Sequence, residues 1–258
     1  MTGGPTHAHP LQGVLLILLA AAFFASLDSS ARGISQPGPG WGVPVLLIMT
    51  VRYTVQAVVM AVALAPRGRV AFLSVHPKFQ WLRGLLLLAT SFFSFFAVSL
   101  MPVPEYTAIN MLTPLLVTVL AAGLLHEKVS ALRWLLVGGG FVGALIVIRP
   151  GSGAFGWVVV LPLLAAATYA SFQVLTSRLA GADSPLTTHF WTGLVGTAVL
   201  WPVLGVAAAS HGLGDSLAIA QRLSPVAWLA MVACGLLATV GHLFLILALG
   251  KAAALQLP

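Results

Sequence analysis

Long runs of apolar residues dominate the chain, and short segments rich in proline, glycine or charge separate them. Each run is long enough to cross the hydrocarbon core of a bilayer as a helix, which rises about 1.5 Å per residue. A further helix is expected to begin at Ala252, close to the last residue. We predict eight complete transmembrane helices, at residues 11–31, 43–65, 81–101, 105–125, 132–148, 154–177, 185–209 and 225–249.

The composition agrees with this pattern. The 258 residues are 59% hydrophobic and 7% charged, and the mean hydropathy is +1.04. A soluble domain carries about 25% charged residues, so this chain has too few charges to cover a surface that faces water. We therefore predict an all-α integral membrane protein in contact with the lipid bilayer. The net charge of +7 then bears on membrane orientation and not on nucleic-acid binding.

Lysine and arginine gather on alternate segments between the predicted helices. Because such residues concentrate on the cytoplasmic face, we expect the N-terminus in the cytoplasm of a multi-pass protein of the inner (plasma) membrane. The segments then placed inside contain Arg67, Arg69, Lys78, Arg83, Lys128, Arg133, Arg178 and Lys251, whereas the outer ones contain Arg32, Arg149 and Arg222.

The chain looks internally repeated, and the motif "RPG" at 149–151 divides it unequally. Residues 1–150 hold five predicted helices, and residues 151–258 hold three and the start of a fourth. An odd number of helices gives the two copies opposite orientations, and such inverted repeats are typical of secondary transporters. The second copy is shorter by most of two helices, so we expect the chain to be a fragment.

Several stretches, in this order, resemble one family. They are "FASLDSSAR", "VRYTVQA", "MPVPEYTAINMLTPLLVTVLAAGLLHEKVSALRWLLVGGGFVGALIVIRPG" and "ALGKAAALQLP". Together they are similar to the EamA-type members of the drug/metabolite transporter superfamily. The resemblance implies ten helices in two inverted five-helix repeats, and transport of a metabolite or drug-like molecule by alternating access. It leaves import and efflux equally open.

Among the charged residues within predicted helices, Asp28 and Arg52 are of particular interest, because a charge inside a membrane costs about 2.5–3.5 kcal/mol and usually has a partner or a function. Asp28 has two interpretations: it lies at the outer interface, neutralised by Arg32, or it turns inward toward Arg52 or a cationic substrate. Arg52 lies deeper in its helix, so we favour a paired or cavity-facing role for it.

The fourth predicted helix contains the best candidates for a cavity lining in the first half. Glu105 is either an acid stabilised by the helix N-terminus or a carboxylate that faces substrate or protons. Asn110, Thr113 and Pro114 share roughly one side of the helix. Pro114 frees a backbone carbonyl, which is tolerated in a membrane where it lines a cavity. Polar packing is the alternative for all three.

The remaining candidates lie at the inner mouth and in the second half. Glu127 is interpreted as a solvated loop charge or a gate contact rather than a substrate ligand. Tyr169 and Gln173 are four residues apart in one helix, and His189 and Trp191 lie early in the next. Each could line a cavity. A lone histidine in a membrane is more often packed than functional, but its pKa would also suit proton coupling.

Other classes of chemistry find little support in the sequence. The histidines lack metal-ligand spacing, no phosphate-binding loop of the Gly-x-x-x-x-Gly-Lys type occurs, and Cys234 is alone. We therefore expect no metal or cofactor, and secondary transport of a small molecule by a monomer or a homodimer. A non-transporting receptor or assembly partner and an intramembrane enzyme are the alternatives. A polar cavity beside a kinked fourth helix would favour transport.

Overall fold

The computed structural model describes residues 10–36, 41–124, 129–148, 156–209 and 221–254, and this part of the chain is helical. Beyond helices it contains one isolated bridge, between Ala180 and Asp183. The α-helices are α1 (Pro10–Ser35), α2 (Val45–Leu64), α3 (Pro77–Leu100), α4 (Val103–Asn110), α5 (Thr113–Leu124), α6 (Ala131–Ile148), α7 (Val160–Arg178), α8 (Pro185–Ala209) and α10 (Pro225–Ala254). Short 3-10 turns are η1 (Ala65–Arg67), η2 (Arg69–Phe72) and η3 (Gly156–Val159).

Seven helical segments in the described residues are long and apolar enough to cross a membrane. They agree with seven of the eight predicted spans. The predicted fifth span corresponds to α6, whose apolar stretch Trp134–Gly143 is shorter than the others. Many large apolar side chains on these helices face outward, as expected where lipid covers the surface. The chain is therefore a helical, multi-pass membrane protein.

The predicted fourth span is not one continuous helix. α4 ends at Asn110, and α5 begins at Thr113 with Pro114 in its first turn. Proline lacks a backbone N–H, and its ring clashes with the carbonyl four residues earlier, which here belongs to Asn110. The helix therefore breaks at Met111 and Leu112, and it restarts where proline is tolerated.

Some helix ends also differ from the predicted ones, and two of these differences have a clear physical reason. α3 begins at Pro77, four residues before the predicted start, because proline suits the first turn of a helix. α10 continues through Gly250 to Ala254, so in the described residues Ala252 belongs to α10 and does not begin the further helix that we expected there. Alanines on both sides of Gly250 favour the helix enough to carry it past one glycine.

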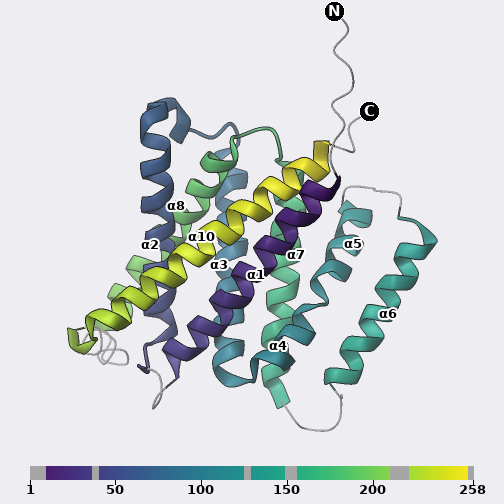
Figure 1. Ribbon diagram of the computed structural model, residues 1–258, viewed down its shortest axis with the longest axis horizontal. Helices are drawn as coiled ribbons and strands as arrows, with labels where there is room; N and C mark the ends of the chain where they lie inside the picture. The colour runs from purple at the N-terminus through teal and green to yellow at the C-terminus, as the bar shows by residue number, and fades with distance from the viewer. Residues whose placement is uncertain (1–9, 37–40, 125–128, 149–155, 210–220, 255–258) are drawn as a thin grey trace, which may run out of the picture.

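The helices pack as antiparallel pairs around a centre. α1 lies along α10, α2 along α8, and α3 along α7, while α4, α5 and α6 lie on one side of this group (Figure 1). Glycine allows the closest approach of α2 and α8, because a Cβ on Gly193 would lie 2.7 Å from the backbone nitrogen of Ala57. This arrangement brings side chains from both halves of the chain into the centre of the bundle.

Candidate functional site

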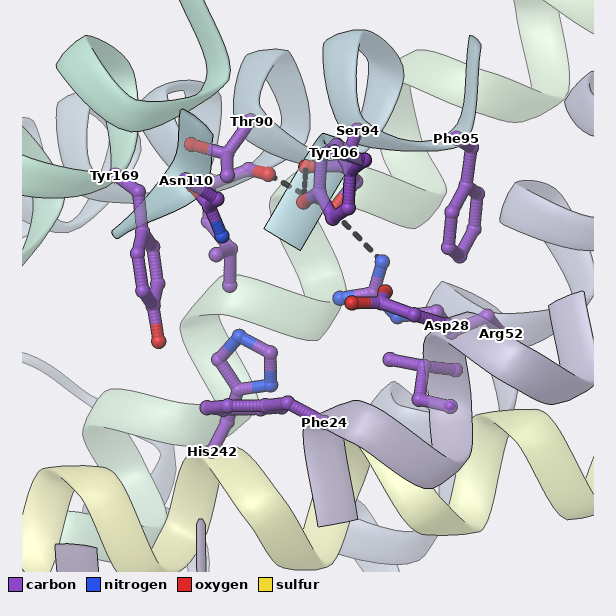
Figure 2. A pocket seen from close by; sticks show the side chains of 13 residues that line it. Phe24, Asp28, Arg52, Thr90, Ser94, Phe95, Tyr106, Asn110, Tyr169 and His242 are labelled. Carbon is purple, nitrogen blue, oxygen red and sulfur yellow. Dashed lines mark hydrogen bonds between the residues drawn. The ribbon is translucent and has the colours of Figure 1, made fainter. Parts of the chain in front are cut away.

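A cavity of about 80 Å³ lies in the centre of the bundle, between α1, α2, α3, α4, α7 and α10 (Figure 2). Its wall combines a carboxyl group and a guanidinium group with several hydroxyl groups and aromatic rings. The lining residues are Phe24, Leu27, Asp28, Arg52, Leu87, Thr90, Ser91, Ser94, Phe95, Tyr106, Asn110, Tyr169 and His242.

Arg52 is the positive charge of this cavity, and α3 holds it in place. Its side chain is 2% exposed, and its Nη1 donates a hydrogen bond of 2.7 Å to the hydroxyl of Ser91. The guanidinium lies 4.7 Å from the ring centre of Tyr53 and 5.6 Å from that of Phe95, a geometry that favours a cation. Its Nε has no hydrogen-bond partner. The structure thus places Arg52 at the cavity, with donor capacity to spare.

Asp28 is the acidic residue of this cavity, which it lines from α1 together with Arg52 from α2 (Figure 2). Arg32, the partner considered for Asp28 at the outer interface, instead donates to the carbonyls of Val98 and Met101 at 2.6 and 2.5 Å. It thereby satisfies carbonyls at the end of α3 that lack helical partners. The inward orientation of Asp28 fits the structure better than neutralisation by Arg32.

The break between α4 and α5 presents Asn110 to the cavity. The hydroxyl of Thr113 donates to the amide oxygen of Asn110 at 3.2 Å. Figure 2 shows the amide nitrogen of Asn110 pointing toward the cavity, so a hydrogen-bond donor faces inward. One turn earlier, Tyr106 lines the cavity, and its hydroxyl donates to Ser94 at 2.9 Å.

Aromatic rings form the opposite wall. The rings of Phe24 and His242 meet edge to face with centres 4.6 Å apart. The ring centre of Tyr169 lies 6.3 Å from that of Phe24. The ring of Tyr169 is also parallel to that of Phe172, with the two centres 5.9 Å apart. Such rings favour the flat face of an aromatic ligand, whereas the charged wall favours its polar edge.

His189 and Trp191 lie outside the cavity lining. His189 is fully buried, with Nδ1 at 3.3 Å from the amide nitrogen of Gln56 and Nε2 at 3.0 Å from the carbonyl of Thr239. Trp191 donates its indole N–H to the carbonyl of Phe72 at 3.0 Å, which ties α8 to η2. Both residues hold helices and turns together.

Four more candidates are also absent from the lining, among them Thr113, whose hydroxyl bonds Asn110. Glu105 lies in the first turn of α4, where the helix dipole favours an acid, and its Oε2 is buried without a hydrogen-bond partner. Pro114 faces a groove between α5 and α6, because the helix break changes the register after Asn110. Gln173 is half-buried on α7. Glu127 lies outside the residues that the structure describes.

Several cavity residues were missing from the prediction. Thr90, Ser91 and Ser94 lie on the apolar helix α3, and Ser94 follows the other two by four and three residues, spacings that keep side chains on one side of a helix. Hydroxyl groups repeated on one face of a membrane helix were the signal that could have revealed them. Tyr106 had no comparable local signal, since only the tertiary fold brings it to this centre.

The fold and the site define a class: a polytopic helical membrane protein with a polar, aromatic-walled cavity at the centre of its bundle. In the described part of the chain, no group of three or more His, Cys, Asp or Glu side chains could hold a metal ion. The EamA-like transporter family matches residues 11–149, which is more than half of the chain. The chain belongs to this family, as its resemblance predicted.

Curated relatives and a solved structure are similar to it. A riboflavin transporter of Vibrio cholerae serotype O1 is 32% identical over 182 residues, which cover 69% of this chain and 60% of the relative. An S-adenosylmethionine uptake transporter of Rickettsia prowazekii is 25% identical over 152 residues, which cover 59% of this chain and 52% of the relative. The chain thus spans little more than half the length of these relatives. A crystal structure of a protein 22% identical to this chain matches it with a TM-score of 0.60. The match covers 94% of this chain and 82% of the other chain, which supports the fold.

Proposed function

We propose that the protein is a secondary transporter that takes up a small metabolite with a flat heteroaromatic ring and a hydroxyl-bearing chain or sugar. The observation that carries this proposal is the central cavity, where Asp28, Arg52 and Asn110 face aromatic rings. Riboflavin and S-adenosylmethionine, the compounds named for the relatives, both have this combination of groups. The rings of Phe24 and Tyr169 suit the flat part, and the charged and amide groups suit the polar part.

The size of the cavity indicates that substrate binding requires a conformational change. Its volume of about 80 Å³ has room for a few water molecules, whereas small-molecule sites usually have about 300–1,000 Å³. Alternating access supplies such a change, because the two halves of the molecule rock against each other and open the centre to one side at a time.

The pairing of helices supports an inverted repeat with residues 1–150 as the first copy and 151–258 as the second. If α7, α8 and α10 correspond to α1, α2 and α3, a two-fold relation makes the contact of α1 with α10 equivalent to that of α7 with α3, and it maps the contact of α2 with α8 onto itself. These are the pairs that pack along each other. The two further contacts of α2 with α10 and of α3 with α8 are also related by this symmetry.

Orientation and coupling complete the proposal. The distribution of lysine and arginine supports an inner-membrane protein with a cytoplasmic N-terminus, and uptake is then inward transport. Asp28 is the acid of the cavity, so it is the candidate for a proton carrier coupled to transport. A homodimer remains a prediction from the sequence.

Uptake by cells that express the protein tests this function. Labelled riboflavin and S-adenosylmethionine are supplied separately, and we expect one of them to accumulate above the empty-vector level. Arg52→Gln should abolish that uptake. Arg69→Gln, at an exposed position of η2, is the matched control and should retain it. Uptake at the empty-vector level for both compounds would refute the substrate class.

A further inference from the structure

A second buried polar cluster lies between the cavity and the predicted cytoplasmic ends of α3, α7 and α8. Its centre is Arg83 of α3, whose side chain is completely buried. The guanidinium donates to groups on three helices. The acceptors are Gln80 Oε1 at 3.1 Å, Thr176 Oγ1 at 3.4 Å, the carbonyl of Thr188, and Thr192 Oγ1.

Asp183, in the connection between α7 and α8, forms the outer layer of the cluster. Its carboxylate accepts hydrogen bonds from Ser74 Oγ at 2.5 Å, the Val75 N–H at 2.9 Å and Gln80 Nε2 at 2.8 Å. Burial raises the pKa of Asp183, but these hydrogen bonds and the nearby His76 outweigh burial and hold the pKa below its ordinary value. The carboxylate is therefore charged at neutral pH, and Gln80 connects it to Arg83.

The cluster lies across the route from the cavity to the cytoplasm. On α3, Leu87 lines the cavity, and Arg83 comes one helical turn nearer the predicted cytoplasmic end. On α7, Tyr169 lines the cavity, and the ring of Phe172 lies next, with its centre 5.2 Å from the Arg83 guanidinium. Leu87 and Phe172 pack in one buried apolar group. An apolar layer and then a polar layer thus close this end of the bundle.

The polar layer joins the two halves that must separate in alternating access. Ser74, Gln80 and Arg83 belong to the first half, whereas Thr176, Asp183 and Thr192 belong to the second. An inward opening has to break these hydrogen bonds. Because the released groups can bond to water instead, the net free-energy change for each bond is only a fraction of its strength in isolation. Such a seal can open and close repeatedly.

We propose that the cluster of Gln80, Arg83, Asp183 and Thr192 is a cytoplasmic latch that holds the transporter closed on its inner side. This inference rests on the alternating access of the proposed function. Breaking the latch should favour the inward-open state without any change in the cavity wall.

Cysteine accessibility tests the latch. The buried Cys234 is first replaced by alanine, which removes the single cysteine of the chain. Leu87→Cys then places a thiol in the cavity wall on the latch side. A membrane-impermeant maleimide is added to the cytoplasmic face of inside-out vesicles, and the rate of labelling is measured.

Two variants weaken the latch, and one serves as the control. Asp183→Asn removes the charge, and Thr192→Val removes an acceptor of Arg83 with little change in shape. Thr197→Val removes a hydroxyl on the same helix that donates to the Gly193 carbonyl at 2.8 Å, within α8 itself. We expect each latch variant to increase the labelling rate about tenfold and the control to leave it unchanged.

The outcomes separate the latch from the transport proposal, since labelling needs no substrate. Unchanged labelling in both latch variants, with monodisperse protein in detergent, overturns the latch even if uptake is observed. Rapid labelling of the parent from the cytoplasmic face also overturns it, because the inner side would then be open already. Increased labelling in both latch variants supports the latch even if neither riboflavin nor S-adenosylmethionine is transported.

Discussion

Replacing Ser91 by alanine removes the hydroxyl that accepts the hydrogen bond of 2.7 Å from Arg52. Arg52 is 2% exposed, so bulk water does not take the place of the lost oxygen. Its Nε already has no partner, and a hydrogen bond to a charged group contributes about 1.5–3 kcal/mol. We therefore expect Ser91→Ala to lower the free energy of unfolding by about 2 kcal/mol, which corresponds to a fall in Tm of about 4–8 °C.

The assay is thermal unfolding of the purified protein in detergent, followed by tryptophan fluorescence. Ser99→Ala is the matched control, because Ser99 lies on the same helix and donates to the carbonyl of Phe96 at 2.9 Å. The control should keep a Tm close to that of the parent. If Ser91→Ala and Ser99→Ala unfold at the same temperature, the hydroxyl of Ser91 does not stabilise the buried guanidinium.

Three further predictions concern packing, pH and specificity. Gly193→Ala should lower the free energy of unfolding by about 1–3 kcal/mol in detergent melts, whereas Gly205→Ala, with open space around it, should not. Folding lowers the pKa of Asp183 from 3.8. The charged carboxylate therefore stabilises the folded protein fully above pH 3.8, and this stabilisation is lost as the pH falls through the lower pKa of the folded state. Asp183→Asn should flatten that part of a Tm–pH curve. Thr113→Val should raise the KM for uptake about tenfold by releasing the cavity amide, whereas Thr118→Val should not. Equal effects of Gly193→Ala and Gly205→Ala, or of Thr113→Val and Thr118→Val, would contradict these assignments. So would a Tm–pH curve of Asp183→Asn that matches the parent's curve at low pH.

The spans were predictable because length and hydropathy are local properties of the sequence. The same is true of the irregularity at Pro114, since a proline acts on the carbonyl four residues before it. Its orientation was not predictable, because the break at Met111 and Leu112 changes the register of α5 relative to α4. Pro114 therefore faces α6 while Asn110 faces the cavity.

Arg83 illustrates what local patterns miss. The count of positive charges assigned it to a cytoplasmic segment, yet its side chain is completely buried in α3. The groups that make this burial tolerable, at Thr176, Thr188 and Thr192, lie about 100 residues further along the chain. Hydropathy contains no information on which distant hydroxyl and carbonyl groups will surround a guanidinium.

Ligand binding by the purified protein tests whether the cavity around Arg52 binds a heteroaromatic metabolite. Riboflavin fluorescence is titrated with protein in detergent, and S-adenosylmethionine binding is measured by calorimetry. We expect saturable binding of at least one compound, its loss in Arg52→Gln, and its retention in Arg69→Gln. Binding of neither compound, or equal binding by Arg52→Gln and the parent, would show that this cavity is not the substrate site.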